Sequence, residues 1–208
     1  MALGKPMPHL AMSKAEQTKQ FIIETAAPIF NLKGYENTSL SDIQEATRLT
    51  KGAIYGNFSD KNELALAAYE YISSLVIKRI GDRMRDAVSP GEALLSYPEY
   101  YVQHSKSVLE KGGCALMNAA VEADDYLYFM RDAVRKSIKR FIKLLEGIIE
   151  KGQSENVFKD NINAAEYATL IFSIMEGNIM LAKIMNDAKY FQIAVKRIKH
   201  LVRTELES

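Results

Sequence analysis

A short polar segment at residues 50–57 carries side chains that could bind a nucleic-acid duplex. The hydroxyl groups of Thr50 and Tyr55 can donate hydrogen bonds to phosphate oxygens, and Lys51 can reach a phosphate or the edge of a guanine. Gly52 and Ala53 are small enough to let a helix lie deep in a major groove. The outward-facing residues predicted for this segment are Thr50, Lys51, Gly52, Ala53, Tyr55 and Asn57.

Two short helices would have to hold this segment in place. Ser39, with Asp42 three residues later, is typical of a helix start, so we expect a helix at about 40–47. A tight turn follows, and Thr50 can begin a second helix at about 51–57. The apolar residues that can form an inner face are Leu40, Ile43, Ala46, Leu49, Ile54 and Phe58. Two helices joined in this way predict a helix-turn-helix at about residues 39–58.

The rest of the chain also reads as helix. Apolar residues recur at helical spacing and no segment shows sustained strand alternation, which predicts an all-α fold of about nine helices. The predicted helices span 14–33, 40–47, 51–57, 61–86, 91–110, 115–122, 125–152, 163–185 and 188–205. The boundary between an N-terminal unit (14–74) and a larger unit (75–208) falls inside the long fourth helix. Pro28 predicts a kink or a tightened last turn in the first helix.

Many fixed offsets in residues 14–70 resemble those of the TetR family of bacterial transcription regulators. The matching residues are Gly34-Tyr35, Thr38-Ser39-Leu40-Ser41-Asp42-Ile43, Thr50-Lys51-Gly52-Ala53-Ile54-Tyr55, Phe58, Lys61 and Leu64. The resemblance implies an N-terminal DNA-binding domain, joined by a long helix to a C-terminal domain that binds a ligand and dimerises. The match is weaker in the C-terminal part, because that domain diverges widely in the family.

The resemblance also implies which residues contact DNA. Thr38 matches a phosphate-contact position, and Lys61 matches the family's phosphate-binding lysine at a helix N-terminus. Arg48 stands where the turn usually carries Gly, so it would take a left-handed conformation and could add a phosphate contact. Gly56 replaces a frequent His or aromatic residue, so the usual contact there is in doubt. The predicted DNA-binding residues are Thr38, Ser39, Arg48, Thr50, Lys51, Gly52, Ala53, Tyr55, Asn57 and Lys61.

The segment that begins Gly112-Gly113-Cys114 looks like a motif in one branch of the family. Family pockets lie among the helices that follow and precede it, which implies a small apolar or amphipathic inducer. The predicted ligand-binding residues are Tyr97, Tyr101, His104, Cys114, Met117, Asn118, Phe129, Met130, Phe172, Met175 and Asn178. Helical spacing alone leaves open that these residues are plain core. Cys114 has two interpretations, a redox or electrophile sensor and a small buried residue.

The predicted helix 163–185 is apolar nearly all round, which indicates burial on more than one side. The resemblance implies that this helix and 188–205 pair two subunits as a homodimer. The alternative is the central core helix of a monomer.

Composition narrows the possible functions. The chain has 208 residues and a single cysteine, so no intramolecular disulfide can form and a reducing, cytoplasmic location is expected. No run of 18 or more apolar residues occurs, so we expect no membrane span. Residues 1–12 lack the apolar core of a signal peptide.

Catalytic patterns are poor in this sequence. His9, His104 and His200 are far apart, and none stands at metal-ligand spacing with Cys, Asp or Glu. Asp124-Asp125 is interpreted as a helix cap and not as a carboxylate pair. The basic run at 131–143 is interpreted as the solvated face of a helix. We expect no enzyme, no metal site and no cofactor.

These patterns together predict a ligand-responsive repressor that binds a palindromic operator as a homodimer. The half-site centres would lie about 34 Å apart, or a simple extension of that. The alternative is a helical small-molecule-binding protein or enzyme whose helix-turn-helix only packs, and an activator or a regulator without a ligand also stays open. The net charge of +1 predicts few phosphate ion pairs.

Overall fold

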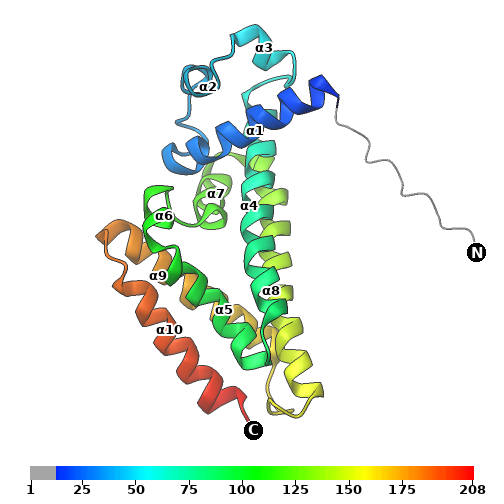
Figure 1. Ribbon diagram of the computed structural model, residues 1–208, viewed down its shortest axis with the longest axis vertical. Coiled ribbons are helices and arrows are strands. Elements are labelled where there is room, and N and C mark those ends of the chain that lie inside the picture. Colours follow the sequence, from blue (N-terminus) through cyan, green and yellow to red (C-terminus); the bar gives the residue numbers. More distant parts are fainter. Residues whose placement is uncertain (1–12) are drawn as a thin grey trace, which may run out of the picture.

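The structure, a computed structural model, describes residues 13–208 of the chain. His9 and the segment considered above as a signal peptide lie outside the described residues. Within the described range the fold is all-helical, as expected (Figure 1). The helices are α1 Lys14–Lys33, α2 Leu40–Thr47, α3 Lys51–Tyr55, α4 Lys61–Asp86, α5 Pro90–Gln103, α6 Ser105–Glu110, α7 Ala115–Asp125, α8 Arg131–Ser154, α9 Ala164–Met185 and α10 Lys189–Leu201. A 3-10 turn, Tyr128–Met130, precedes α8, and a π-helical segment, Val202–Leu206, follows α10.

The N-terminal helices begin where the sequence predicts. The Ser13 hydroxyl accepts from the Glu16 N–H and Glu16 binds the Ser13 N–H in return, so α1 starts with a capping box. Ser39 and Asp42 make the same exchange at α2. Thr50 caps α3 through the Ala53 N–H at 3.2 Å. These local bonds satisfy N–H groups that have no partner within the helix.

Two hydrophobic clusters hold the fold together. One joins α1, α2, α3 and the first half of α4, and it extends to α7 and the start of α8 through Ala119, Met130 and Val134. The other fills the space among α5, α8, α9, α10 and the second half of α4. The helix α4 contributes to both clusters, and Figure 1 shows α7 between α1 and the C-terminal helices α9 and α10. Because α7 packs in the N-terminal cluster, a movement of α7 would change its contacts with α1.

Two expectations about helix boundaries were wrong. The predicted helix 91–110 is divided at His104, because α5 ends at Gln103 and α6 begins at Ser105. The predicted helix 125–152 starts only at Arg131, because α7 runs on to Asp125 and Arg131 binds the Asp124 carbonyl at 2.9 Å. The helix α1 spans Lys14–Lys33 as predicted and continues through Pro28, where the kink stays a prediction.

By length and composition alone, α9 could cross a membrane, with a mean hydropathy of 1.4 over 18 residues. The sequence does not predict a membrane span here, because polar residues interrupt the apolar positions of this segment. The structure packs α9 against α8 and α10 and buries its Glu176 side chain against Tyr97 of α5. These contacts are typical of a core helix.

Candidate nucleic-acid interface and interior cavity

The helix α3 presents a small polar face to solvent. Thr50, Lys51, Gly52 and Tyr55 are exposed, while Ile54 is completely buried and fixes the helix on the core. A Cβ added at Gly52 would meet no atom within 4 Å, so the backbone here can be approached closely. The Lys51 ammonium lies 5.7 Å from the centre of the Tyr55 ring, on the same exposed face.

The turn before α3 takes the conformation expected from its unusual residue. Arg48 has φ 60° and ψ 21°, which is left-handed, and its N–H binds the Gln44 carbonyl at 2.8 Å. Its side chain is exposed beside α3. The turn therefore keeps the geometry that Gly would supply and adds one cationic side chain to the polar face.

Two predicted phosphate-contact residues, Thr38 and Lys61, donate their side-chain hydrogen bonds to backbone carbonyls of the protein itself. Thr38 is fully buried, and its hydroxyl donates to the Gly34 carbonyl at 2.6 Å. This corrects the expectation for the Thr38 side chain, which helps to close the loop between α1 and α2 and does not reach the surface. The Lys61 ammonium donates to the carbonyls of Glu36 and Thr38, at 2.7 and 3.2 Å. In this structure it stabilises the same loop.

A small cavity with an ionisable group lies inside the C-terminal cluster. Glu176 of α9 is only 5% exposed, and its Oε1 accepts from the Tyr97 hydroxyl and the Cys114 thiol, both at 3.2 Å. Its Oε2 is buried and has no hydrogen-bond partner among the described residues. The cavity has a volume of about 10 Å³, which is room for about one water molecule. Its lining consists of Val76, Ile77, Ile80, Tyr97, Tyr101, Cys114, Leu116, Phe141, Phe172 and Glu176.

Burial sets the protonation of this cluster. Removal from water disfavours the charged form and raises the pKa of Glu176 to about 7, although the bonds from Cys114 and Tyr97 act in the opposite direction. Burial also raises the pKa of the Cys114 thiol well above its ordinary value, and the nearby Glu176 adds to this effect. A buried neutral thiol is a poor nucleophile, so the geometry favours the interpretation of Cys114 as a small buried residue.

A larger groove lies outside this cavity, between the end of α1, α7 and α9. It has a volume of about 780 Å³ and a mainly apolar lining. Its wall consists of Asn31, Leu32, Lys33, Gly34, Cys114, Met117, Asn118, Val121, Glu122, Ile179, Met180, Lys183 and Ile184. Cys114 lines both the groove and the inner cavity, so the two spaces adjoin at this residue.

Polar contacts join α1 to α7 at the edge of the groove, and we call this set the α1–α7 junction. The Glu122 carboxylate accepts from the N–H groups of Tyr35 and Glu36, at 3.0 and 2.9 Å. The Asn118 amide donates to the Asn31 side-chain oxygen and to the Gly112 carbonyl, at 3.0 and 2.8 Å. A side chain at Gly112 would come within 2.6 Å of the Asn31 carbonyl oxygen, so the backbones approach closely here.

The sequence matches families that cover both parts of the chain. Residues 22–68 match "Bacterial regulatory proteins, tetR family", and residues 90–198 match "Tetracyclin repressor-like, C-terminal domain". The chain belongs to the TetR family. It is an all-helical transcriptional regulator with an N-terminal helix-turn-helix that binds DNA, and this family is not enzymatic.

Known TetR-family relatives extend over nearly the whole chain. A transcriptional regulator structure from Cytophaga hutchinsonii is 34% identical, with a TM-score of 0.90, and the alignment covers 95% of this chain and 98% of that one. The uncharacterised regulator YxaF of Bacillus subtilis is 26% identical over 92% of this chain and 98% of its own length. The repressor DhaR of a Mycobacterium species is 22% identical over 80% of this chain and 82% of its own.

The structure of this TetR-family chain brings together only some of the predicted ligand-binding residues. Tyr97, Tyr101, Cys114 and Phe172 line the inner cavity, and Met117 and Asn118 line the groove. The Asn118 amide is already engaged in the α1–α7 junction.

The remaining predicted ligand-binding residues line neither space. Met130 is buried in the other hydrophobic cluster, Phe129 is exposed, and His104 is exposed at the α5–α6 break. Met175 is fully buried core, and the Asn178 amide donates to the Ile174 carbonyl of its own helix. For these five residues the structure favours core or surface roles over ligand contact.

Glu176 is a site residue that the sequence patterns did not predict. The available signal was an acidic residue in the middle of the apolar stretch of α9, because a carboxylate on such a face is buried only with partners or with a function.

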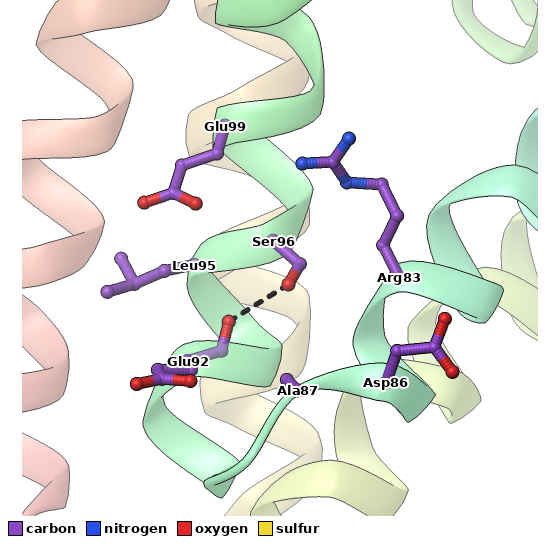
Figure 2. Close-up of a pocket in the computed structure, with 7 residues that line it drawn as sticks. All are labelled: Arg83, Asp86, Ala87, Glu92, Leu95, Ser96 and Glu99. Carbon is purple, nitrogen blue, oxygen red and sulfur yellow. Dashed lines mark hydrogen bonds between the residues drawn. The ribbon is translucent and has the colours of Figure 1, made fainter.

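An open polar hollow between the end of α4 and α5 contains none of the predicted residues. Figure 2 shows its lining, in which the Ser96 hydroxyl donates to the Glu92 backbone carbonyl of the same helix at 3.1 Å. Its charged side chains, Arg83, Asp86, Glu92 and Glu99, come from helix surfaces. The hollow is typical of a solvated junction between two helices, so the inner cavity and the groove are the better candidates for a ligand site.

Proposed function

We propose that this TetR-family chain is a ligand-responsive repressor that binds a palindromic operator as a homodimer. The observation that carries the proposal is the exposed face of α3, where Lys51 and Tyr55 stand beside an unobstructed Gly52. Such a face suits entry into a major groove, with the hydroxyl groups and the lysine in reach of phosphates and base edges. The relative DhaR is named as a repressor, which supports repression as the direction of control.

An exposed apolar surface supports the homodimer. On α9, Met180, Ile184 and Met185 are 53%, 76% and 58% exposed, and Ile193 of α10 is 48% exposed. Apolar side chains gathered on two neighbouring helices favour contact with another protein surface over water. Pairing with the same helices of a second copy would cover them on both subunits and set the distance between two α3 helices. Met180 and Ile184 also line the groove, so the proposed interface and the groove adjoin.

The α1–α7 junction supplies a route from ligand to DNA. A ligand in the groove would contact Met117 and Asn118 of α7, and the adjacent Glu122 holds the backbone that follows α1. Displacement of α7 would then move α1 and, with it, α3. Ligand and operator would oppose each other through one coupling free energy, which acts equally in both directions.

A gel shift with the DNA upstream of the chain's own gene tests the proposal. We expect sequence-selective binding that falls at least about tenfold in Lys51→Ala and in Tyr55→Ala, since each loses a charged or hydroxyl contact. Lys139→Ala, on the exposed face of α8, is the matched control and should bind as the unmodified protein does. Unchanged binding in both α3 variants would overturn the assignment of the interface. A protein that shifts no DNA would support the alternative of a helical ligand-binding protein.

A further inference from the structure

We propose that Glu176 anchors an amphipathic amine, whose apolar body occupies the groove between α1, α7 and α9 and whose ammonium head donates to the buried carboxylate. This inference rests on the proposed function, because it names the class of ligand to which such a regulator would respond. It adds a chemical preference that neither the helical fold nor the apolar groove implies.

The unpartnered Oε2 of Glu176 favours a ligand that carries a hydrogen-bond donor. Its Oε1 already accepts from Tyr97 and Cys114, so further donors have only Oε2 to bind. Among the described residues that line the cavity, none is basic, and the polar ones are Tyr97, Tyr101, Cys114 and Glu176 itself. A buried acceptor without a donor is costly, and a carboxylate without a cation more so. A ligand that brings a positively charged donor removes both costs, whereas an anionic ligand would add to them.

Protonation supports the same choice. Burial raises the pKa of Glu176 to about 7, so near neutral pH a large fraction of molecules carries a negative charge in this cavity. The pKa values of Tyr97, Tyr101 and Cys114 are raised well above their ordinary values, so these groups stay neutral and supply no countercharge.

The sizes and positions of the cavity and the groove also favour an amphipathic amine. The cavity takes a group about as large as one water molecule, which suits an ammonium head and excludes a ring. The body of the ligand has about 780 Å³ in the adjoining groove, and Cys114 lines both spaces. Glu176, Ile179, Met180 and Lys183 follow each other at helical spacing on α9, so the carboxylate lies one turn from the apolar wall of the groove.

The groove lining also contains the charged side chains of Glu122 and Lys183, and the Glu122 carboxylate already accepts from two backbone N–H groups. Lys183 lies seven residues after Glu176, about 10 Å along the helix axis, and its ammonium binds the Asn118 side chain at 3.3 Å. A cationic head is repelled at Lys183 and attracted at Glu176. Lys183 therefore favours the orientation in which the amine lies inward, at Glu176.

Three compounds that share one apolar body and differ only in the head group test the proposal. We would measure binding of 4-phenylbutylamine, 4-phenylbutanol and 4-phenylbutyrate to the full chain by isothermal titration calorimetry at pH 7.5. The amine should bind about tenfold or more tightly than the alcohol, because its hydrogen bond to Glu176 is charge-assisted, and the carboxylate should bind most weakly. In Glu176→Gln the preference for the amine should fall to within about twofold. Glu166→Gln, an exposed residue on the same helix, should keep the full preference.

Several results would overturn the inference. These are equal affinities for amine and alcohol, no binding of the amine at millimolar concentration, or an unchanged preference in Glu176→Gln. If that variant does not fold, the head-group series on the unmodified protein still decides. A gel shift without ligand separates the two proposals: operator binding without an amine preference removes only the inference, and an amine preference without operator binding removes only the proposed function.

Discussion

At the scale of single residues, the unusual group is the carboxyl of Glu176. It is buried among tyrosine, cysteine and apolar side chains, and one of its oxygens has no partner among the described residues. Proteins seldom keep such a group without partners, because the same burial that strengthens its hydrogen bonds also penalises its charge. The residue therefore connects stability, pH and the proposed ligand chemistry.

The pH dependence of stability follows from this residue. Its pKa is about 7 in the folded protein against an ordinary value of 4.5, so the folded state binds more protons between these two values. The free energy of unfolding should fall as the pH rises through that window, by up to about 3 kcal/mol from this group. Glu176→Gln removes this titration. As the pH rises from 5 to 8, the free energy of unfolding of the variant should therefore increase relative to that of the unmodified protein. Urea unfolding at fixed protein concentration measures this difference, and two parallel curves would contradict it.

Residue-level predictions from the sequence succeeded where the cause is local. Arg48 is left-handed as expected, because the geometry of the turn depends only on its own backbone. The Thr38 hydroxyl is buried because it binds the Gly34 carbonyl, a contact that an offset in a motif does not reveal. Glu176 was missed because helical periodicity reports which face is apolar, not which polar atom lacks a partner inside that face.

At the scale of elements, the α1–α7 junction joins the two functional halves. The Glu122 side chain replaces missing backbone partners at the end of α1, and Asn118 ties the loop before α7 to Asn31. The starts of α1, α2 and α3 were predictable from their capping residues. The junction was not, because its partners lie more than 80 residues apart in sequence.

Removal of the Glu122 carboxylate should loosen this junction. Glu122→Ala leaves the N–H groups of Tyr35 and Glu36 without their acceptor, so we expect a loss of about 1–2 kcal/mol in the free energy of unfolding. Asp125→Ala, exposed on the same helix, is the control and should change stability by less than about 0.5 kcal/mol. Chemical denaturation compares the two. Equal small losses in both variants would show that the junction contributes little.

At the scale of the whole molecule, the exposed apolar side chains of α9 and α10 imply an assembly larger than one chain. Ile184→Glu places a charge on the most exposed of the large apolar side chains of α9, at 76% exposure, and should convert the dimer to a monomer. Operator affinity should fall at least about tenfold, since two α3 helices are no longer held at a fixed separation. Light scattering after gel filtration measures the mass. Val88→Glu, 88% exposed at the α4–α5 turn, should stay dimeric, and a dimeric Ile184→Glu would contradict the proposed interface.

The distribution of charge over the molecule makes a further prediction about salt. Residues 1–60 contain six basic and six acidic side chains, and two of the basic ones, Lys19 and Lys33, form ion pairs with Glu63 and Asp42. Lys61 binds carbonyl groups, so Arg48 and Lys51 are the cations beside α3 that are free to meet phosphates. With two such side chains per subunit, a bound dimer should lose affinity with a slope of about −4 in log K against log salt concentration.

Lys51→Ala should reduce this slope to about −2, because each dimer loses two phosphate contacts. Lys139→Ala, far from α3 on α8, should leave it unchanged. Fluorescence anisotropy with labelled operator at several salt concentrations gives both values. A slope of about −8 or steeper would mean that Lys61 and other cations leave their present partners on binding DNA, and that the loop between α1 and α2 rearranges at the operator.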